Sequence, residues 1–418
     1  YSASVALAGW PFPYFDQPVN VTLRAVDRAG NEATTSVAAD VTRLRWAIAS
    51  EAVTPPQLTG AAIAPNGNII VGGSNSKLYF FDGAGNITAS PLIGSVGITS
   101  APSIGPTAIW VASNDGKVYA VAADGSAILN APGCDTLSAT VGVPALFGAG
   151  RDVALVGSTA AQALYAVRVN PPLCAPTDAG EPFASSAAVA ADSGAYAITR
   201  ALNSATNIRR YTQAVSGSAT QRWVAGAGTN VLAPLALDLQ SRVLMSSQDG
   251  TLLRAVDQGA SGSVAPLASL PAQAEASPIV LGNGDVVVGL TAGAVHRLSN
   301  SGAAVWASPP DVGDTVRGLA ALSAGLDGSD VLATTALGEI AALRPDGTIA
   351  WSGRPATAAL SFPAVVPAAP GGLPTAYAGS QDGKLYAVVV DGPLDAAAPW
   401  PKAHHDLANS ANASSPLP

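Results

Sequence analysis

The chain has few charged side chains and very few histidines. Lysine, arginine, aspartate and glutamate make up 11 % of its 418 residues, and there are three histidines. Histidine is the usual proton carrier near neutral pH, so few residues are candidates for acid–base catalysis. His296 falls in a recurring apolar string, where packing is the simpler role. His404 and His405 adjoin Asp406 in a stretch that we predict to be extended, and no further ligand follows at zinc-binding spacing. The sequence therefore predicts no catalytic and no metal-binding residue.

Carboxylates are sparse too, and most lie where turns are expected. These aspartates each stand directly before a glycine: Asp82, Asp115, Asp249, Asp346 and Asp382. An aspartate in such a turn bonds to its own backbone, and that role accounts for them. Calcium in the loop from Leu326 to Asp330 is a weaker alternative, because the alternating oxygen ligands of a known calcium loop are missing. We therefore predict no bound cofactor.

Positive charge is in deficit, and no long uninterrupted apolar helix is evident. The net charge is −8, and an acidic surface repels the phosphates of nucleic acids. Residues 358–380 form a stretch of 23 residues without a charge, but four prolines interrupt it. A membrane-spanning helix would not tolerate that pattern. The sequence therefore predicts neither nucleic-acid binding nor a transmembrane segment, while 48 % hydrophobic residues argue against disorder.

Glycine and proline are abundant, which suits short strands joined by many turns. The string from Ser380 to Val388 has an Asp-Gly turn followed by Lys-Leu-Tyr-Ala-Val, and copies of it recur along the chain. The copies begin their apolar run at Leu78, Val118, Leu164, Ile208, Leu252, Val295, Ile340 and Leu385. Intervals of 40 to 46 residues separate them, so the chain contains eight units. A closed array of such repeats can exceed the length of one ordinary domain.

Each unit contains short segments typical of strands, and several are apolar on both faces. Val286 to Leu290 is an example, and an open antiparallel sheet would expose one of those faces to water. Such runs fit sheets stacked face to face around an axis. The strand around Trp46 has no inner strands before it, and the last unit, with Leu385 and Tyr386, lacks a clear fourth strand. We therefore predict an all-β, eight-bladed β-propeller in residues 43–395 that closes by strand exchange, with the Trp46 strand completing the last blade.

Residues 1–42 differ in kind from the repeats. Val19 to Asp27 alternates as a half-buried strand, a turn follows, and Glu32 to Val41 returns as a second strand. This hairpin resembles the last two strands of immunoglobulin-like modules of secreted bacterial proteins, which implies a partial β-sandwich at the N-terminus. An aromatic cluster precedes it, made of Trp10, Phe12, Tyr14 and Phe15. Aromatic side chains beside sandwich strands usually fill a core, and an interface is the alternative.

The repeated Asp-Gly-Lys-Leu-Tyr-Ala-Val string, with a fourth-strand tryptophan such as Trp223, Trp306 or Trp351, resembles the pyrroloquinoline-quinone-type (PQQ-like) β-propeller repeat of bacteria. The C-terminal tail, 396–418, is similar through Trp400-Pro401 and His405-Asp406 to the segment that flanks such propellers in secreted bacterial proteins. The family contains quinoprotein dehydrogenases and a non-catalytic lipoprotein of the outer-membrane barrel-assembly machinery. The dehydrogenase resemblance would imply a longer chain, a vicinal cysteine pair and a calcium-holding cluster, and this sequence departs from that pattern. Fold alone does not choose between the activities.

Two further pairs of residues were candidate sites. Cys134 and Cys174 stand nearly one repeat apart, in comparable loops of adjacent units, where a disulfide is geometrically reasonable and two free thiols are the alternative. A disulfide would imply an oxidising compartment. Arg209 and Arg210, in the most diverged repeat, could mark an interaction edge, with a solvated strand face as the alternative.

These features predict a non-catalytic interaction or adhesion scaffold that is extracellular, on the cell surface or in the periplasm of a bacterium, with a protein or cell-surface partner. The rival class is an enzyme that uses the propeller's central pocket, either quinone-dependent or acting on polysaccharide. A third alternative is an outer-membrane assembly factor. A carboxylate-lined central pocket would favour the enzyme, and a plugged channel beside a broad apolar rim would favour the scaffold.

Overall fold

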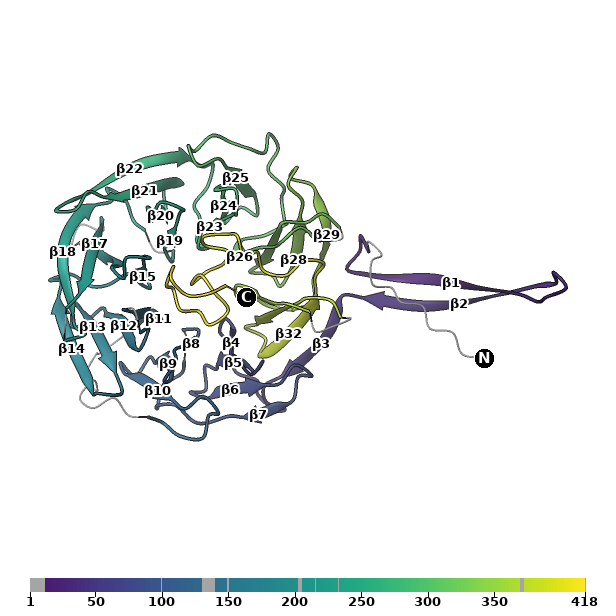
Figure 1. Cartoon of the computed structure of the whole chain (residues 1–418), viewed down its shortest axis with the longest axis horizontal. Helices are drawn as coiled ribbons and strands as arrows, with labels where there is room; N and C mark the ends of the chain where they lie inside the picture. The colour runs from purple at the N-terminus through teal and green to yellow at the C-terminus, as the bar shows by residue number, and fades with distance from the viewer. Residues whose placement is uncertain are drawn as a thin grey trace.

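The strands form eight sheets arranged in a ring, with a ninth, two-stranded sheet outside it (Figure 1). The computed structural model describes residues 12–98, 100–129, 140–148, 150–201, 205–214, 216–231, 233–325, 327–368 and 372–417. The predicted all-β, eight-bladed β-propeller is confirmed. These residues contain no helix, and therefore none long and apolar enough to cross a membrane.

Seven of the eight sheets are each built from one continuous stretch of chain, with consecutive strands side by side. Their strands are β4 (Ala62–Ile63), β5 (Ile69–Gly72), β6 (Leu78–Phe81) and β7 (Ile87–Ala89); β8 (Ser103–Ile104), β9 (Ile109–Ala112) and β10 (Val118–Val121); β11 (Thr140–Phe147), β12 (Val153–Ser158), β13 (Ala163–Arg168) and β14 (Leu173–Asp178); β15 (Ala188–Val189), β16 (Ala195–Arg200), β17 (Thr206–Gln213) and β18 (Ala219–Gly226); β19 (Ala236–Leu237), β20 (Val243–Ser246), β21 (Thr251–Asp257) and β22 (Gly262–Ser269); β23 (Ile279–Val280), β24 (Val286–Gly289) and β25 (Val295–Leu298); and β26 (Val316–Ala321), β27 (Val331–Thr335), β28 (Ile340–Leu343) and β29 (Ile349–Gly353).

The eighth sheet joins the two ends of the ring. β30 (Ala364–Val366), β31 (Thr375–Gly379) and β32 (Lys384–Val389) are followed in the sheet by β3 (Leu44–Ala49), from the start of the ring. In the register of this antiparallel pair, Trp46 lies opposite Ala387 and Ala47 opposite Tyr386. The N-terminal strand therefore occupies the fourth position of the last blade, which is the arrangement that the two incomplete ends of the sequence predict.

The positions that define the sequence repeat all lie in the third strand of a sheet, from Leu78 in β6 to Leu385 in β32. In five of the eight units a glycine with positive φ stands two residues before this position, whereas Ser76 and Gln162 hold a left-handed φ in two others. Gly383 has φ +82, in the left-handed region, and a Cβ atom there would lie 2.2 Å from the Cβ of Pro55. The Asp-Gly pair of the repeat is therefore a backbone requirement rather than a chemical site.

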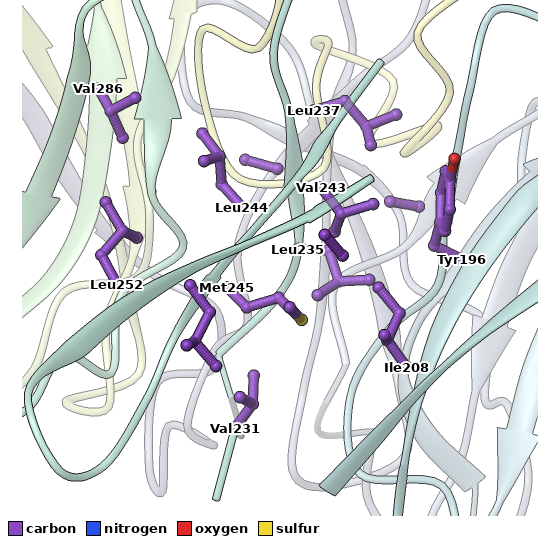
Figure 2. Close-up of a cluster of buried hydrophobic side chains, with 14 of the residues drawn as sticks. Tyr196, Ile208, Val231, Leu235, Leu237, Val243, Leu244, Met245, Leu252 and Val286 are labelled. Carbon is purple, nitrogen blue, oxygen red and sulfur yellow. The ribbon is translucent and has the colours of Figure 1, made fainter. Parts of the chain in front are cut away.

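The hydrophobic core lies between neighbouring sheets. In Figure 2, Val243 and Leu244 of β20 lie between Tyr196 and Ile208 of one neighbouring sheet and Val286 of the other. All five are at most 2 % exposed. Burial against a sheet on each side explains why these strands are apolar on both faces.

The β1–β2 ribbon, β1 (Asp16–Val26) and β2 (Glu32–Thr42), projects away from the ring (Figure 1). It is the hairpin that the sequence predicts, but within the described residues it pairs with no further strand. The predicted immunoglobulin-like sandwich is therefore not seen, and the strands are mostly exposed rather than half-buried.

Candidate functional site

The C-terminal segment fills the axis of the ring. In Figure 1 its yellow trace lies in the middle of the eight sheets. Six first strands donate a backbone N–H to its carbonyl oxygens at 2.6–2.9 Å: Ile63 to Leu407, Ile104 to Ala408, Leu146 to Ser410, Val189 to Ala411, Val280 to Trp400 and Ala321 to Pro401. Strand edges that would otherwise be open at the axis are therefore paired within the chain. We call residues 394–417 the axial plug.

Lys402 and Asn409 form the polar centre of the axial plug, and both are fully buried. Lys402 Nζ donates to three oxygens at 2.6–2.9 Å, namely two plug carbonyls and Asn409 Oδ1. Asn409 Nδ2 in turn donates to the carbonyl oxygens of Ala61 (3.0 Å) and Pro102 (3.1 Å), beside the first strands of the first two sheets. Burial lowers the pKa of Lys402 to about 7. Each polar atom of this centre has a partner, so its arrangement holds the plug in place.

The histidines of the tail are buried in the axial plug and not extended, so that expectation is wrong. His404 and His405 have φ of 63° and 73° and belong to a tight turn. Their rings pack on Phe362 (5.4 Å between ring centres) and Trp400 (5.0 Å). Burial, reinforced by the charge of Lys402, lowers the pKa of His404 to about 3, so this imidazole is neutral at physiological pH. Both rings therefore act as packing groups at the axis.

Arg43 anchors the ribbon to the ring. It stands between β2 and β3 and is 3 % exposed, and its guanidinium pairs with Asp391 at 2.7 Å. The same group lies over the Trp351 ring at 4.4 Å and donates to the carbonyl oxygen of Tyr14 at 3.0 Å. Burial, together with a hydrogen bond to Asp327, raises the pKa of Asp391 to about 6. A buried charge network thus fixes the base of the ribbon.

The aromatic cluster before the ribbon is divided between packing and exposure. Phe15 packs on Trp351 of β29, with ring centres 6.2 Å apart, and belongs to the edge of the core. Phe12 is half-buried and meets the edge of Tyr14, which is 50 % exposed. Trp10 lies outside the described residues. Of the predicted interface, the exposed part is therefore centred on Tyr14.

The two faces of the β1–β2 ribbon differ in polarity. Its eleven-residue strands pair from end to end without a bulge. Val21 lies opposite Val37 on one face, and Leu23 follows on that face; these side chains are 39 %, 54 % and 45 % exposed. The other face bears the ion pair of Arg24 with Glu32 and a hydrogen bond between Thr22 and Ser36. The exposed apolar face of the ribbon is therefore the most evident candidate contact surface.

Arg209 and Arg210 do not form an exposed edge, so the predicted interface there is wrong. Arg210 is 1 % exposed, pairs with Asp257 (3.1 Å) and Asp192, and lies over the Tyr196 ring at 4.4 Å. Arg209 pairs with Glu181 at 2.9 Å. The third strand of each sheet is covered by neighbouring sheets, and carboxylates from two loops (Glu181, Asp192) and from the end of β21 (Asp257) neutralise both arginines there.

The structure bears differently on the predicted disulfide and on the loop considered as an alternative calcium site. Cys174 lies in β14, partly buried, but Cys134 lies outside the described residues, so their pairing stays a prediction. In the loop proposed for calcium, Asp327 Oδ1 accepts from Ser329, and Asp330 pairs with Arg297 at 2.7 Å. Where the chain is described, no three histidine, cysteine, aspartate or glutamate side chains gather as a metal site would require.

Comparisons with known proteins show the fold alone. No protein-family model and no curated protein matches the chain. The computationally designed Ika8 protein matches with a TM-score of 0.63 at 13 % identity, over 80 % of this chain and 97 % of that one. BamB from Moraxella catarrhalis matches at 0.59 and 14 % identity, over 83 % and 99 %. Sqt1 from Saccharomyces cerevisiae matches at 0.62 and 13 % identity, over 83 % and 99 %. The chain is thus a β-propeller protein with the fold of BamB and Sqt1.

Proposed function

We propose that the protein is a non-catalytic interaction scaffold of the bacterial cell surface or envelope, and that the β1–β2 ribbon is its contact element. The observation that carries this proposal is the exposed apolar face of the ribbon, which projects from a ring whose inner strands are paired, in six of the sheets, with the axial plug. A two-stranded ribbon in water is marginally stable alone. It gains stability when another sheet covers that face.

The partner chemistry follows from the edges of the ribbon. Both outer backbone edges are unpaired among the described strands, no bulge interrupts them, and neither strand contains lysine. Bulges, lysine and proline are features by which proteins block pairing between chains. β1 contains Pro18 but β2 contains no proline, so the outer edge of β2 is the less protected one. The ribbon therefore suits an extended strand or a sheet from a protein partner. The rest of an immunoglobulin-like sandwich would bury the same face. We therefore include in this proposal that the ribbon is part of such a module.

The axial plug supports a non-catalytic role. Propeller enzymes of the quinone type would bind their cofactor near the axis, and here the chain itself fills that position with satisfied polar groups. The likeness in fold to BamB, together with the sequence resemblance to a family that contains a lipoprotein of the outer-membrane barrel-assembly machinery, supports the envelope as the location. The same likeness makes an outer-membrane assembly factor the second candidate function. The identity of the partner would distinguish the two candidates.

Site-specific crosslinking tests the proposal. A photoreactive benzophenone residue replaces Leu23 on the apolar face or, as matched control, Arg24 on the other face, in cells that make the protein natively. We expect a covalent adduct with a different protein from position 23 and little from position 24. Equal yields from the two positions, or no adduct from position 23, would overturn the role of the ribbon. Stoichiometric quinone or metal in the purified protein would favour the enzyme instead.

A further inference from the structure

A hollow of about 420 Å³ opens at one mouth of the ring's axis, beside the axial plug. Its walls come from the turns that join the first and second strands of the first three sheets, together with plug residues from Asp406 to Leu417. It shares no residue with the β1–β2 ribbon, so a ligand here would be a function separate from the proposed scaffold contact.

The wall of the hollow is mainly apolar. The side chains that supply this surface are those of Ile63, Pro65, Ile104, Pro106 and Leu417. Concave apolar sites of this kind bury most of a small ligand and gain their affinity from the surface removed from water. The body of a ligand that fits here is therefore apolar.

Among the described residues that line the hollow, Arg151 is the only cationic one. It lies in the turn between β11 and β12, is partly buried, and has a left-handed φ of 50°. Within the described part of the chain its side chain has no hydrogen-bond or ion-pair partner. Arg43, Arg210 and Arg297, in contrast, each face a carboxylate. Arg151 is therefore a guanidinium available to a ligand.

Asp406, the one carboxylate among the described residues of the wall, does not compete for that role. Asp406 is 3 % exposed, and its Oδ1 accepts the N–H of Ser410 at 2.9 Å while Oδ2 accepts from the hydroxyl of the same serine. Its charge is directed into the plug. We propose that the hollow binds a small ligand with an apolar body and a single carboxylate, which Arg151 holds through its planar pair of N–H donors.

Titration with octanoate tests this proposal on the purified full chain. Calorimetry should find one site, and methyl NMR should show shifts at Ile63 and Ile104 but not at Ile349, which lies in β29. Arg151→Gln should weaken binding roughly 10- to 100-fold, because a charge-assisted bond is lost, and Arg151→Lys should retain part of the affinity. Octanol and octylamine, with the same chain and no carboxylate, should bind more weakly than octanoate.

A second variant keeps the test independent of the charge. Ala408 lines the hollow and is partly exposed, so Ala408→Leu should occupy its volume and weaken octanoate binding without removing Arg151. Equal affinity for octanoate and octanol, an unchanged affinity in Arg151→Gln, or methyl shifts confined to other parts of the ring would each overturn the proposal. An unchanged thermal midpoint of each variant shows that the loss of binding is not a loss of fold.

Discussion

Asn409 is the residue on which the axial plug depends most directly, and replacing it gives a quantitative test. Asn409→Gly removes two donors, to the carbonyl oxygens of Ala61 and Pro102, and the acceptor of Lys402 Nζ. A buried polar group left without a partner costs roughly 1–3 kcal/mol. Two carbonyl oxygens lose this partner, while Lys402 Nζ keeps two of its three acceptors. Because some of these groups will find water, we expect the free energy of unfolding to fall by about 2–4 kcal/mol.

Backbone conformation separates two variants at this position. Asn409 has φ 53°, in the left-handed region, which glycine adopts freely and alanine does not. Asn409→Ala should therefore lose a further ~1–2 kcal/mol relative to Asn409→Gly. Asn66→Gly, in an exposed turn between β4 and β5, is the matched control and should stay within about 0.5 kcal/mol of the parent.

The assay is hydrogen exchange at the amides of Ile63 and Ile104, which donate to Leu407 and Ala408 of the plug, combined with urea unfolding. Loss of the plug's anchor should accelerate exchange at these two amides more than at amides within the outer strands. If Asn409→Gly left both exchange rates and the urea midpoint unchanged, the plug would not be held by this side chain.

Buried ion pairs give two more tests and the closing strand a third. Arg210→Met leaves two carboxylates without their partner and should lower the free energy of unfolding by about 2–3 kcal/mol, while the exposed Arg222→Met should not; equal urea midpoints would contradict this. Because the folded-state pKa of Asp391 is raised to about 6, its contribution to stability is complete below about pH 4 and is lost as pH rises through 6. Asp391→Asn should abolish that slope in pH-dependent unfolding, and a slope identical to the parent's would refute the assignment. Deleting residues 42–50 should destabilise the ring by several kcal/mol, since the last blade loses a strand, and an unaltered calorimetric midpoint would count against closure through β3.

The ring could be predicted from the sequence because its signals are local and repeated. The recurring apolar run marks the third strand of every sheet, even where it is as diverged as at Ile208 and is not preceded by an Asp-Gly pair. The unpaired strand at Trp46 and the missing fourth strand after Tyr386 are also visible as sequence patterns. The packing of each strand between neighbouring sheets favours the same strands that the local sequence favours, so the two levels of structure agree.

The axial plug and the buried arginines could not be predicted in the same way. Lysine, aspartate and asparagine are normally exposed, so composition suggests an extended surface tail for residues that are in fact fully buried. Their partners lie far away in the chain, as Ala61 does from Asn409, and no periodicity encodes such a contact. Arg210 likewise pairs with Asp192, in the turn between β15 and β16, and with Asp257, at the end of β21 in the next sheet, and no periodicity encodes these pairs. The resemblance of the Trp400 segment to the flank of other propellers carried no information about where the segment lies in the fold.

The strand that closes the ring is joined directly to the ribbon. β3 completes the last sheet, and one residue, Arg43, separates it from β2 of the ribbon. The buried pair of Arg43 with Asp391 and its contact with Trp351 restrict how the ribbon can rotate about that joint. A contact surface held in one orientation loses less conformational freedom when a partner binds. The contact surface that we propose is therefore joined to the ring through the buried Arg43 network, although none of these residues touches its apolar face.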